Sequence, residues 1–311
     1  MAGYTDAAFR AVCTDWGAPM CFTEMVSAEA LARGSRKTEA LLRRAPNEAL
    51  IGFQIFAGSP ASAAAAVKIL SRLEPTVIDL NCGCSVPKVL KTGCGAALLR
   101  TPDAIRGIVE AMRQETALPV TVKLRSGWDD ASRNFRDTAE AAVTAGASLV
   151  TLHPRTRAQG FTGKAQWEDI TALAALLPVP VLGSGDLFTS EDVRRMLEST
   201  RCAGVMLARG AVGNPFLFRE AMELLETGSA PPPADAGLRL ETAYRHLTLM
   251  AAFVGERLAC REMRKHCVAY TRGLSGSAAV RQAAVHADTL EEYRSIFAAY
   301  LGVQEFPAAS H

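Results

Sequence analysis

The sequence has no uninterrupted run of about 18 apolar residues, so we expect no membrane-spanning helix. Positive and negative charges are also nearly balanced, with 34 Lys and Arg and 32 Asp and Glu. The net charge of +2 therefore neither requires nor excludes a polyanionic partner. No charged and apolar leader precedes the first helical pattern, so reduced thiols explain the eight cysteines better than a secreted disulfide framework does. We therefore expect a soluble, cytoplasmic, globular protein of about two domains.

Three of the cysteines, Cys82, Cys84 and Cys94, lie near one another in the sequence. A zinc site would require a second cysteine pair or histidines close to the first pair. The Cys-x-Cys spacing here has no matching second pair, and no histidine lies nearby in the sequence. We expect no metal site.

Short β-branched segments alternate with longer Ala-rich helical segments, which is the pattern of a parallel sheet covered by helices. A helix is expected to begin near Asp6, with Thr5 or Asp6 as its N-cap, before any strand. Eight helices against seven strands predict an α/β fold, a TIM (β/α)8 barrel that lacks its first strand in this chain. The expected strands are 20–24, 51–56, 76–81, 120–124, 149–153, 179–183 and 204–208.

A change of composition follows the barrel pattern. Residues 228–233 read Gly-Ser-Ala-Pro-Pro-Pro, and three consecutive prolines form a stiff connector that no helix can continue through. We expect a barrel domain over 1–227, a Pro-rich linker over 228–237 and a small all-helical domain over 238–311.

Reactive groups of TIM barrels lie at the C-terminal ends of the strands, and here three successive strand ends are polar. Each of these residues alone fits an ordinary loop position. Together they make a cationic barrel mouth that suits a phosphate or a developing oxyanion. The three strand ends supply Asn81 with Cys84, Lys123 with Arg125, and His153 with Arg155.

The last two strands open into glycine-containing loops, 183–186 and 208–211, at the positions where this fold usually binds phosphate. Arg209 in the second loop favours an anion. Ordinary glycine turns are the alternative. A dinucleotide fingerprint is not favoured, because Phe188 occupies the place of the third glycine.

Several segments form an ordered set of motifs, among them Asn-Cys-Gly-Cys-Ser-Val-Pro-Lys-Val at 81–89, His-Pro-Arg-Thr-Arg at 153–157 and Met-Arg-Lys-His at 263–266. The others are 1–6, 23–25, 54–58, 122–125 and 185–186. With these motifs the chain resembles the tRNA-dihydrouridine synthases, flavin-dependent enzymes that reduce uridine in tRNA. The resemblance covers nearly the whole chain. Two positions depart from the family pattern: Ser85 replaces a proline, and Ser184 replaces an asparagine.

The resemblance implies FMN as the cofactor and NADPH as the reductant. It implies that Cys84 donates a proton to C5 of a flipped uracil while hydride adds at C6. The residues that it places at the flavin are Met1, Ala2, Gln54, Lys123, His153, Ser184, Gly185, Asp186, Ala208 and Arg209. Those that it places at the substrate are Asn81, Arg125, Arg155, Arg264 and Lys265.

The helical tail carries a local excess of positive charge. Arg257, Arg261, Arg264 and Lys265 follow helical spacing, so one helix face is cationic. This face fits a tRNA partner, and a merely solvated face would have the same pattern. We expect the protein to be monomeric.

Two other functions remain open on the sequence alone. One is an FMN barrel that acts on a free pyrimidine, similar to dihydroorotate dehydrogenase, which the basic tail disfavours. The other is a flavin-less RNA-binding relative. We also expect an in-frame strand upstream of Met1, and weak flavin retention in a chain without it.

Overall fold

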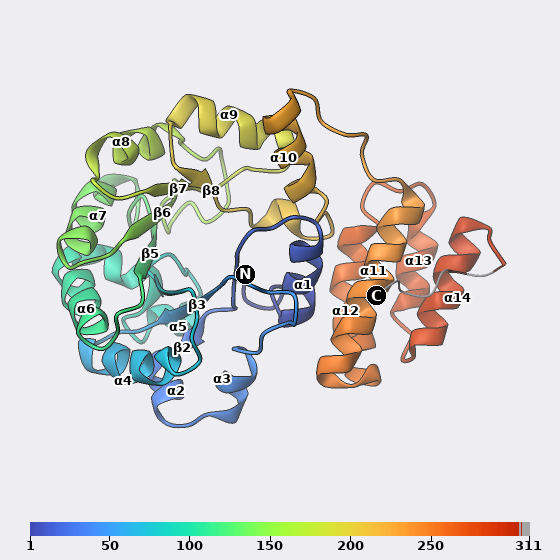
Figure 1. The fold of residues 1–311 in the computed structure, drawn as a ribbon, viewed down its shortest axis with the longest axis horizontal. Coiled ribbons are helices and arrows are strands. Elements are labelled where there is room, and N and C mark those ends of the chain that lie inside the picture. Colours follow the sequence, from blue (N-terminus) through green and yellow to red (C-terminus); the bar gives the residue numbers. More distant parts are fainter. Residues whose placement is uncertain (305, 307–311) are drawn as a thin grey trace.

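The computed structural model describes residues 1–304 and residue 306. Figure 1 shows a sheet surrounded by helices and, beside it, a group of helices coloured orange to red. Helix α1 (Ala7–Asp15) lies between the two parts and packs against helix α11 (Ala236–Val254). No helix of the described residues combines the length and the apolar character that crossing a membrane would require.

The sheet is parallel throughout, with the order β1-β3-β4-β5-β6-β7-β8 and with β2 also pairing with β3. Within the described residues β1 and β8 end the sheet and do not pair with each other, so the barrel is open on that side. The predicted barrel that lacks one strand is therefore confirmed. The strands are β1 (Cys21–Phe22), β2 (Val26–Ser27), β3 (Ile51–Phe56), β4 (Val77–Asn81), β5 (Val120–Arg125), β6 (Leu149–His153), β7 (Val181–Gly183) and β8 (Gly204–Val205).

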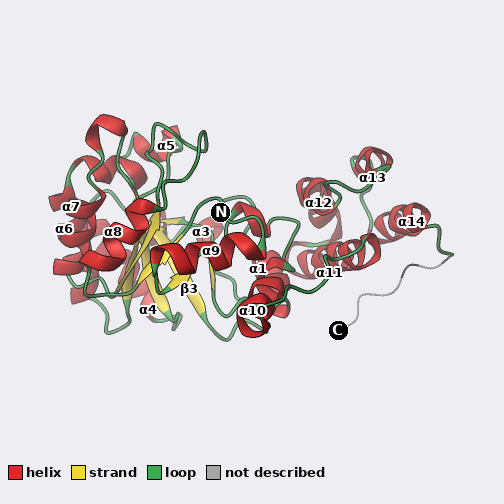
Figure 2. Ribbon diagram, turned by 90° about the horizontal axis from the view of Figure 1, so that it is seen from above, coloured by secondary structure: helices red, strands yellow, loops and turns green. Residues whose placement is uncertain are grey.

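Helices cover the outside of this sheet, as Figure 2 shows from above. Helix α1 precedes every described strand, as predicted, and the Asp6 carboxylate accepts a hydrogen bond from the Phe9 N–H at its start. The further α-helices of the barrel are α2 (Ala28–Ala32), α3 (Arg36–Ala40), α4 (Pro60–Ser71), α5 (Pro87–Leu90), α6 (Pro102–Gln114), α7 (Phe135–Thr144), α8 (Glu168–Leu176), α9 (Ser190–Thr200) and α10 (Leu217–Thr227). Short 3-10 helices are η1 (Gly95–Arg100), η2 (Asp130–Ser132) and η3 (Arg209–Ala211).

All seven expected strands are present, but several are shorter than predicted. The expected strand 20–24 is reduced to β1, and the separate strand β2 was not predicted. Thr23 explains the interruption, because its side-chain Oγ1 accepts the N–H of Gln54 at 3.2 Å. The side chain thus takes a place in the ladder that a backbone carbonyl would otherwise occupy.

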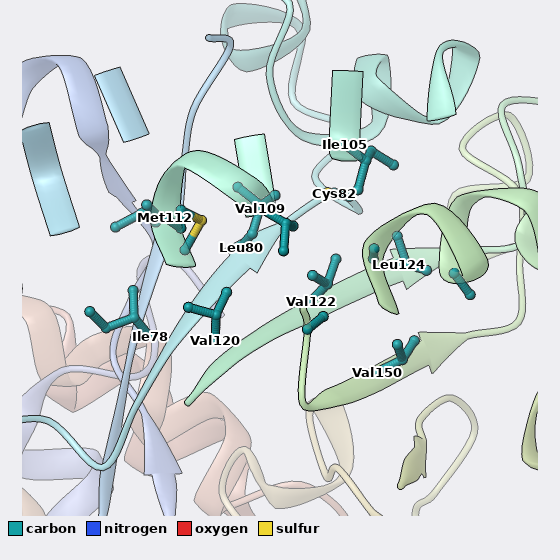
Figure 3. Close-up of a cluster of buried hydrophobic side chains, with 14 of the residues drawn as sticks. Ile78, Leu80, Cys82, Ile105, Val109, Met112, Val120, Val122, Leu124 and Val150 are labelled. Carbon is teal, nitrogen blue, oxygen red and sulfur yellow. The ribbon is translucent and has the colours of Figure 1, made fainter. Parts of the chain in front are cut away.

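Apolar side chains of alternate strand residues pack between the sheet and helix α6 (Figure 3). Ile78 and Leu80 of β4 and Val122 of β5 are fully buried there. Burying each such side chain stabilises the fold by about 1.5–3 kcal/mol. Because successive strand residues face opposite sides, the intervening polar residues of these strands face the barrel interior.

The C-terminal part is helical, as predicted. Helix α10 ends at Thr227 with Gly228 in the left-handed conformation, and Asp235 caps α11. No helix or strand lies between them. Ala8 of α1 belongs to the apolar core of this part, and Asp15 at the end of α1 forms an ion pair with Arg245. The remaining helices are α12 (Glu256–Tyr270), α13 (Ser277–Ala284) and α14 (Leu290–Leu301).

Candidate active site at the barrel mouth

The strand register brings the polar residues of neighbouring strands side by side. Gln54 of β3 pairs with Asp79 of β4, and Asn81 of β4 pairs with Lys123 of β5. Arg125 at the end of β5 pairs with His153 at the end of β6. Five of the predicted site residues therefore lie along one end of the barrel by backbone geometry alone.

A hydrogen-bond network connects the side chains of β3, β4 and β5. The Gln54 amide donates to Asp79 Oδ2 at 2.8 Å, and the Asn81 amide donates to Gln54 Oε1 at 2.8 Å. Thr121 Oγ1 donates to Asp79 Oδ1 at 2.6 Å. Burial raises the pKa of Asp79 to about 6, although the hydrogen bonds from Thr121 and Gln54 oppose the shift. The network fixes the amides of Gln54 and Asn81 in one orientation.

Four cations converge on this end of the barrel. Burial lowers the pKa of His153 to about 2, and Lys123, Arg125, Arg155 and Arg209 all add to this shift. The imidazole is therefore neutral at physiological pH. Burial, followed by the charge of Arg125, lowers the pKa of Lys123 to about 8. Positive charges held so close together make a site for an anionic ligand.

Cys84 follows β4 and is half-buried. Its N–H and that of Gly83 donate to Asn81 Oδ1 at 2.9 and 3.0 Å, so the strand end fixes the turn. Gly95 lies against it, because a Cβ at position 95 would be 2.8 Å from the Cys84 carbonyl oxygen. Burial raises the pKa of the Cys84 thiol, against the effects of a backbone hydrogen bond from Val86 and of Arg125. The group is therefore a protonated thiol near neutral pH.

The neighbouring cysteines Cys82 and Cys94 are both buried. Cys82 belongs to the core that packs against the helices. Burial raises the pKa of both thiols.

Arg125 and Arg155 are almost completely buried, and both use their guanidinium groups inside the protein. Arg125 donates to the carbonyl oxygens of Gly83, Thr156 and Gly160 at 2.9–3.0 Å. Arg125 thus connects the turn that carries Cys84 to the loop after β6. Contact of either arginine with substrate stays a prediction.

Buried Arg155 and half-buried Asp186 form an ion pair that connects the loops after β6 and β7. Arg155 donates to both Asp186 oxygens, at 2.9 and 2.7 Å, and to the carbonyl oxygens of Thr162 and Gly163. Burial would raise the pKa of Asp186, but the hydrogen bonds from Arg155 and the Ala165 N–H outweigh it and lower the pKa.

Arg209 is the more accessible cation. Its guanidinium lies 3.3 Å from Asp186, and 37% of its side chain is exposed. It stands at the start of η3, directly after Ala208. Asp186 therefore orients a cation that a ligand can still reach.

Gly185 requires the absence of a side chain. Its φ is +113°, and a Cβ there would lie 2.8 Å from His153 Cδ2. The adjacent Ser184 is buried, and its N–H donates to the Leu152 carbonyl at 3.0 Å. The loop after β7 is thus fixed tightly against the end of β6.

Met1 is half-buried and Ala2 is exposed. The α-amino group of Met1 donates to Thr5 Oγ1 at 2.8 Å. Burial lowers its pKa to about 6, with Glu24 opposing and Lys123 contributing to the shift. Met1 therefore lies within electrostatic reach of the lysine at the centre of the site.

A sequence model of the dihydrouridine synthases matches residues 1–302. The chain belongs to the dihydrouridine synthase family. A probable tRNA-dihydrouridine synthase of Treponema pallidum (strain Nichols) is 45% identical over 306 residues, which cover 95% of this chain and 90% of that protein. tRNA-dihydrouridine synthase B of Pasteurella multocida (strain Pm70) is 32% identical over 283 residues, covering 91% and 85%. The resemblance predicted from the sequence is confirmed.

The structure of histamine dehydrogenase from Rhizobium sp. 4-9 is similar in fold. Its TM-score is 0.54 at 17% sequence identity, and the match covers 80% of this chain and 47% of that chain. This likeness concerns the fold alone.

Two further predicted site residues of this dihydrouridine synthase lie outside the barrel, on α12. Arg264 makes an ion pair with Asp288 at 3.3 Å, and Lys265 makes one with Glu262. Arg257 also faces Asp288, at 3.8 Å. Acidic partners thus offset part of the predicted cationic face.

Sequence reasoning missed three residues of the site. Asp79 and Thr121 could have been found from strand alternation, which places them on the same side as Asn81 and Lys123. No sequence signal pointed to Phe161, whose side chain is exposed and whose ring centre lies 4.5 Å from the Arg209 guanidinium.

Proposed function

We propose that this dihydrouridine synthase reduces the C5=C6 bond of uridines in tRNA to 5,6-dihydrouridine, with FMN as the bound flavin and NADPH as the reductant. One observation supports this above the others. A protonated, half-buried thiol, Cys84, lies at the same barrel end as a cluster of four cations. Family membership favours a uridine of tRNA over a free pyrimidine.

The chemistry of the barrel mouth fits a flavin phosphate. Its four cations face few acidic groups, chiefly Asp79 and Asp186, so an added anion would be stabilised there. Thr151 Oγ1 on the adjoining strand is buried and has no hydrogen-bond partner among residues 1–304 and 306, which leaves a polar atom for a ligand. When bound, the flavin supplies the hydride for C6 of the uracil.

The residues proposed to hold the flavin come from both sides of the mouth. Arg209 would bind the phosphate, because it is exposed where Arg155 is buried. Gln54 and Lys123 would face the ring, where a cation stabilises negative charge on the reduced cofactor. The remaining proposed contacts are Met1, Ala2, His153, Ser184, Gly185, Asp186 and Ala208.

Cys84 has the properties of the proton donor. Hydride addition at C6 leaves enolate character that extends to C5, and a proton must be added there. A thiol whose pKa is raised by burial keeps its proton at neutral pH and can release it to a carbanion. Asn81 holds the Cys84 turn in place through its Oδ1.

The target uridine must leave the RNA stack to reach Cys84, so the RNA has to be held outside the barrel. We propose that residues 238–311 form the tRNA-binding part, joined to the catalytic domain 1–227 by the linker 228–237. Arg264 and Lys265 would contact the RNA backbone, and Asn81, Arg125 and Arg155 would act near the base. We propose that the protein works as a monomer in the cytoplasm.

Nucleoside analysis of tRNA from a deletion strain tests the function. Complementation with the wild-type gene should restore the dihydrouridine that the strain has lost, and Cys84→Ala should not. Cys82→Ala is the matched control, because Cys82 faces the helices and should support restoration. Dihydrouridine that is undiminished at every tRNA position after deletion would contradict the assignment.

A further inference from the structure

A group of three potential metal ligands, two buried histidines and a half-buried aspartate, lies where the barrel meets the helical part. Asp6 caps α1, His246 lies in α11 and His266 lies in α12. One ligand atom from each residue can be chosen such that all three lie within 4.8 Å of one another. Asp6 is more than 200 positions away from both histidines in the chain, and it meets them because α1 packs on the C-terminal helices.

The two histidines are fully buried, and within the described part of the chain none of their four ring nitrogens has a hydrogen-bond partner. Their ring centroids are 4.4 Å apart in an edge-to-face arrangement. Buried polar groups in native proteins are nearly always hydrogen-bonded or bound to metal, since leaving one unsatisfied costs about 1–3 kcal/mol. Two imidazoles without partners at one point therefore indicate a missing partner.

Among the residues that the structure describes, those around the two histidines supply no hydrogen-bond partner for these nitrogens. The ring of Phe9 lies against both histidines, at 5.6 and 5.7 Å between centroids, and the ring of Tyr4 lies 5.5 Å from His266. These aromatic rings shield the cluster from water. The hydroxyl of Tyr270, whose ring lies 6.1 Å from that of His246, also has no hydrogen-bond partner.

Asp6 contributes the compensating charge. Its Oδ1 accepts the N–H of Phe9 at 2.9 Å, and within the described residues Oδ2 makes no hydrogen bond. One carboxylate oxygen thus fixes the side chain at the start of α1 while the other can turn to an ion. Two imidazoles and a carboxylate are ligands that Zn²⁺ and similar divalent ions accept.

We propose that Asp6, His246 and His266 bind one divalent transition-metal ion of the Zn²⁺ class, which holds the helical part against the barrel. The site is separate from the barrel mouth and is structural. Burial lowers the pKa of both histidines, so both rings are in the neutral form that binds metal. The ion would satisfy a nitrogen on each ring and connect α1, α11 and α12.

Metal titration of the untagged, full-length protein tests the site. After treatment with a chelator, the protein should bind one equivalent of Co²⁺ and show a visible absorption band of the bound ion, at longer wavelengths than oxidised flavin. Zn²⁺ should displace the Co²⁺, abolish this absorption and raise the Tm. Failure of the wild-type protein to bind either ion would overturn the proposal.

Two variants and one control assign the ligands. Asp6→Asn keeps the helix cap, because Asn caps as well as Asp. It should weaken binding at least about 100-fold, since losing even an outer-shell partner costs roughly 10- to 100-fold. His246→Ala should abolish binding, and His286→Ala, at an exposed position, should leave it unchanged. Equal binding by Asp6→Asn and wild type would overturn the proposal even if His246→Ala does not fold.

Discussion

The pair of Arg155 and Asp186 organises the barrel mouth, and Asp186→Asn tests its importance. The substitution keeps the size of the side chain and one oxygen for the Ala165 N–H, but it removes the negative charge. The Arg155 side chain is only 2% exposed, and it would keep the carbonyl oxygens of Thr162 and Gly163 as partners.

The size of the effect follows from this burial. Leaving one member of a buried pair without its partner costs about 3–5 kcal/mol. Asp186 is 27% exposed and Arg155 keeps two acceptors, so we expect a smaller loss, about 2–3 kcal/mol in the free energy of unfolding. At roughly 2–4 °C per kcal/mol for a domain of this size, the Tm should fall by about 4–12 °C.

Thermal unfolding at pH 7 followed by circular dichroism measures this change. Asp130→Asn is the control, because the Asp130 side chain is 70% exposed and its ion pair with Arg133 should contribute only about 0–1 kcal/mol. Flavin content should also fall in Asp186→Asn, since Arg209 loses its orienting carboxylate. A Tm change equal to that of the control would refute the reasoning.

Three other substitutions test the mouth. Gly185→Ala should reduce the flavin bound per chain, because its Cβ would lie 2.8 Å from the histidine ring that ends β6. Gly34→Ala is the control and should not reduce it, because φ is also positive there (+70°) but a Cβ would meet no described atom within 4 Å. Gly95→Ala should lower turnover by displacing Cys84, with little change in flavin absorbance. The kcat/KM profile should fall as pH rises through about 8, where Lys123 loses its proton, and Lys123→Arg should move this limb to higher pH.

The architecture was largely predictable because it depends on local patterns. Alternating apolar residues in 76–81 and 120–124 predict which side of the sheet each residue faces. The helical periodicity between the strands predicts the helices that cover the sheet. The boundary between β1 and β2 was not predictable, because it depends on the Thr23 side chain reaching the Gln54 N–H on a neighbouring strand.

The site was predictable to the extent that strand ends determine it. Asn81, Lys123 and His153 follow from their strand positions. The hydrogen-bond partners of Arg125 and Arg155 could not be predicted from strand positions. Their long side chains donate to loop carbonyl oxygens, and the path of those loops depends on the tertiary structure. The grouping of Asp6 with His246 likewise depends on how α1 packs against α11, and no local sequence pattern predicts it.

A single-turnover experiment with reduced, flavin-loaded protein and unmodified tRNA tests the central proposal most directly. Cys84→Ala should bind tRNA and flavin as wild type does, yet form dihydrouridine about 10²–10⁴ times more slowly, as expected for loss of a general acid. Formation of dihydrouridine at the wild-type rate by Cys84→Ala would contradict the role of this thiol as proton donor.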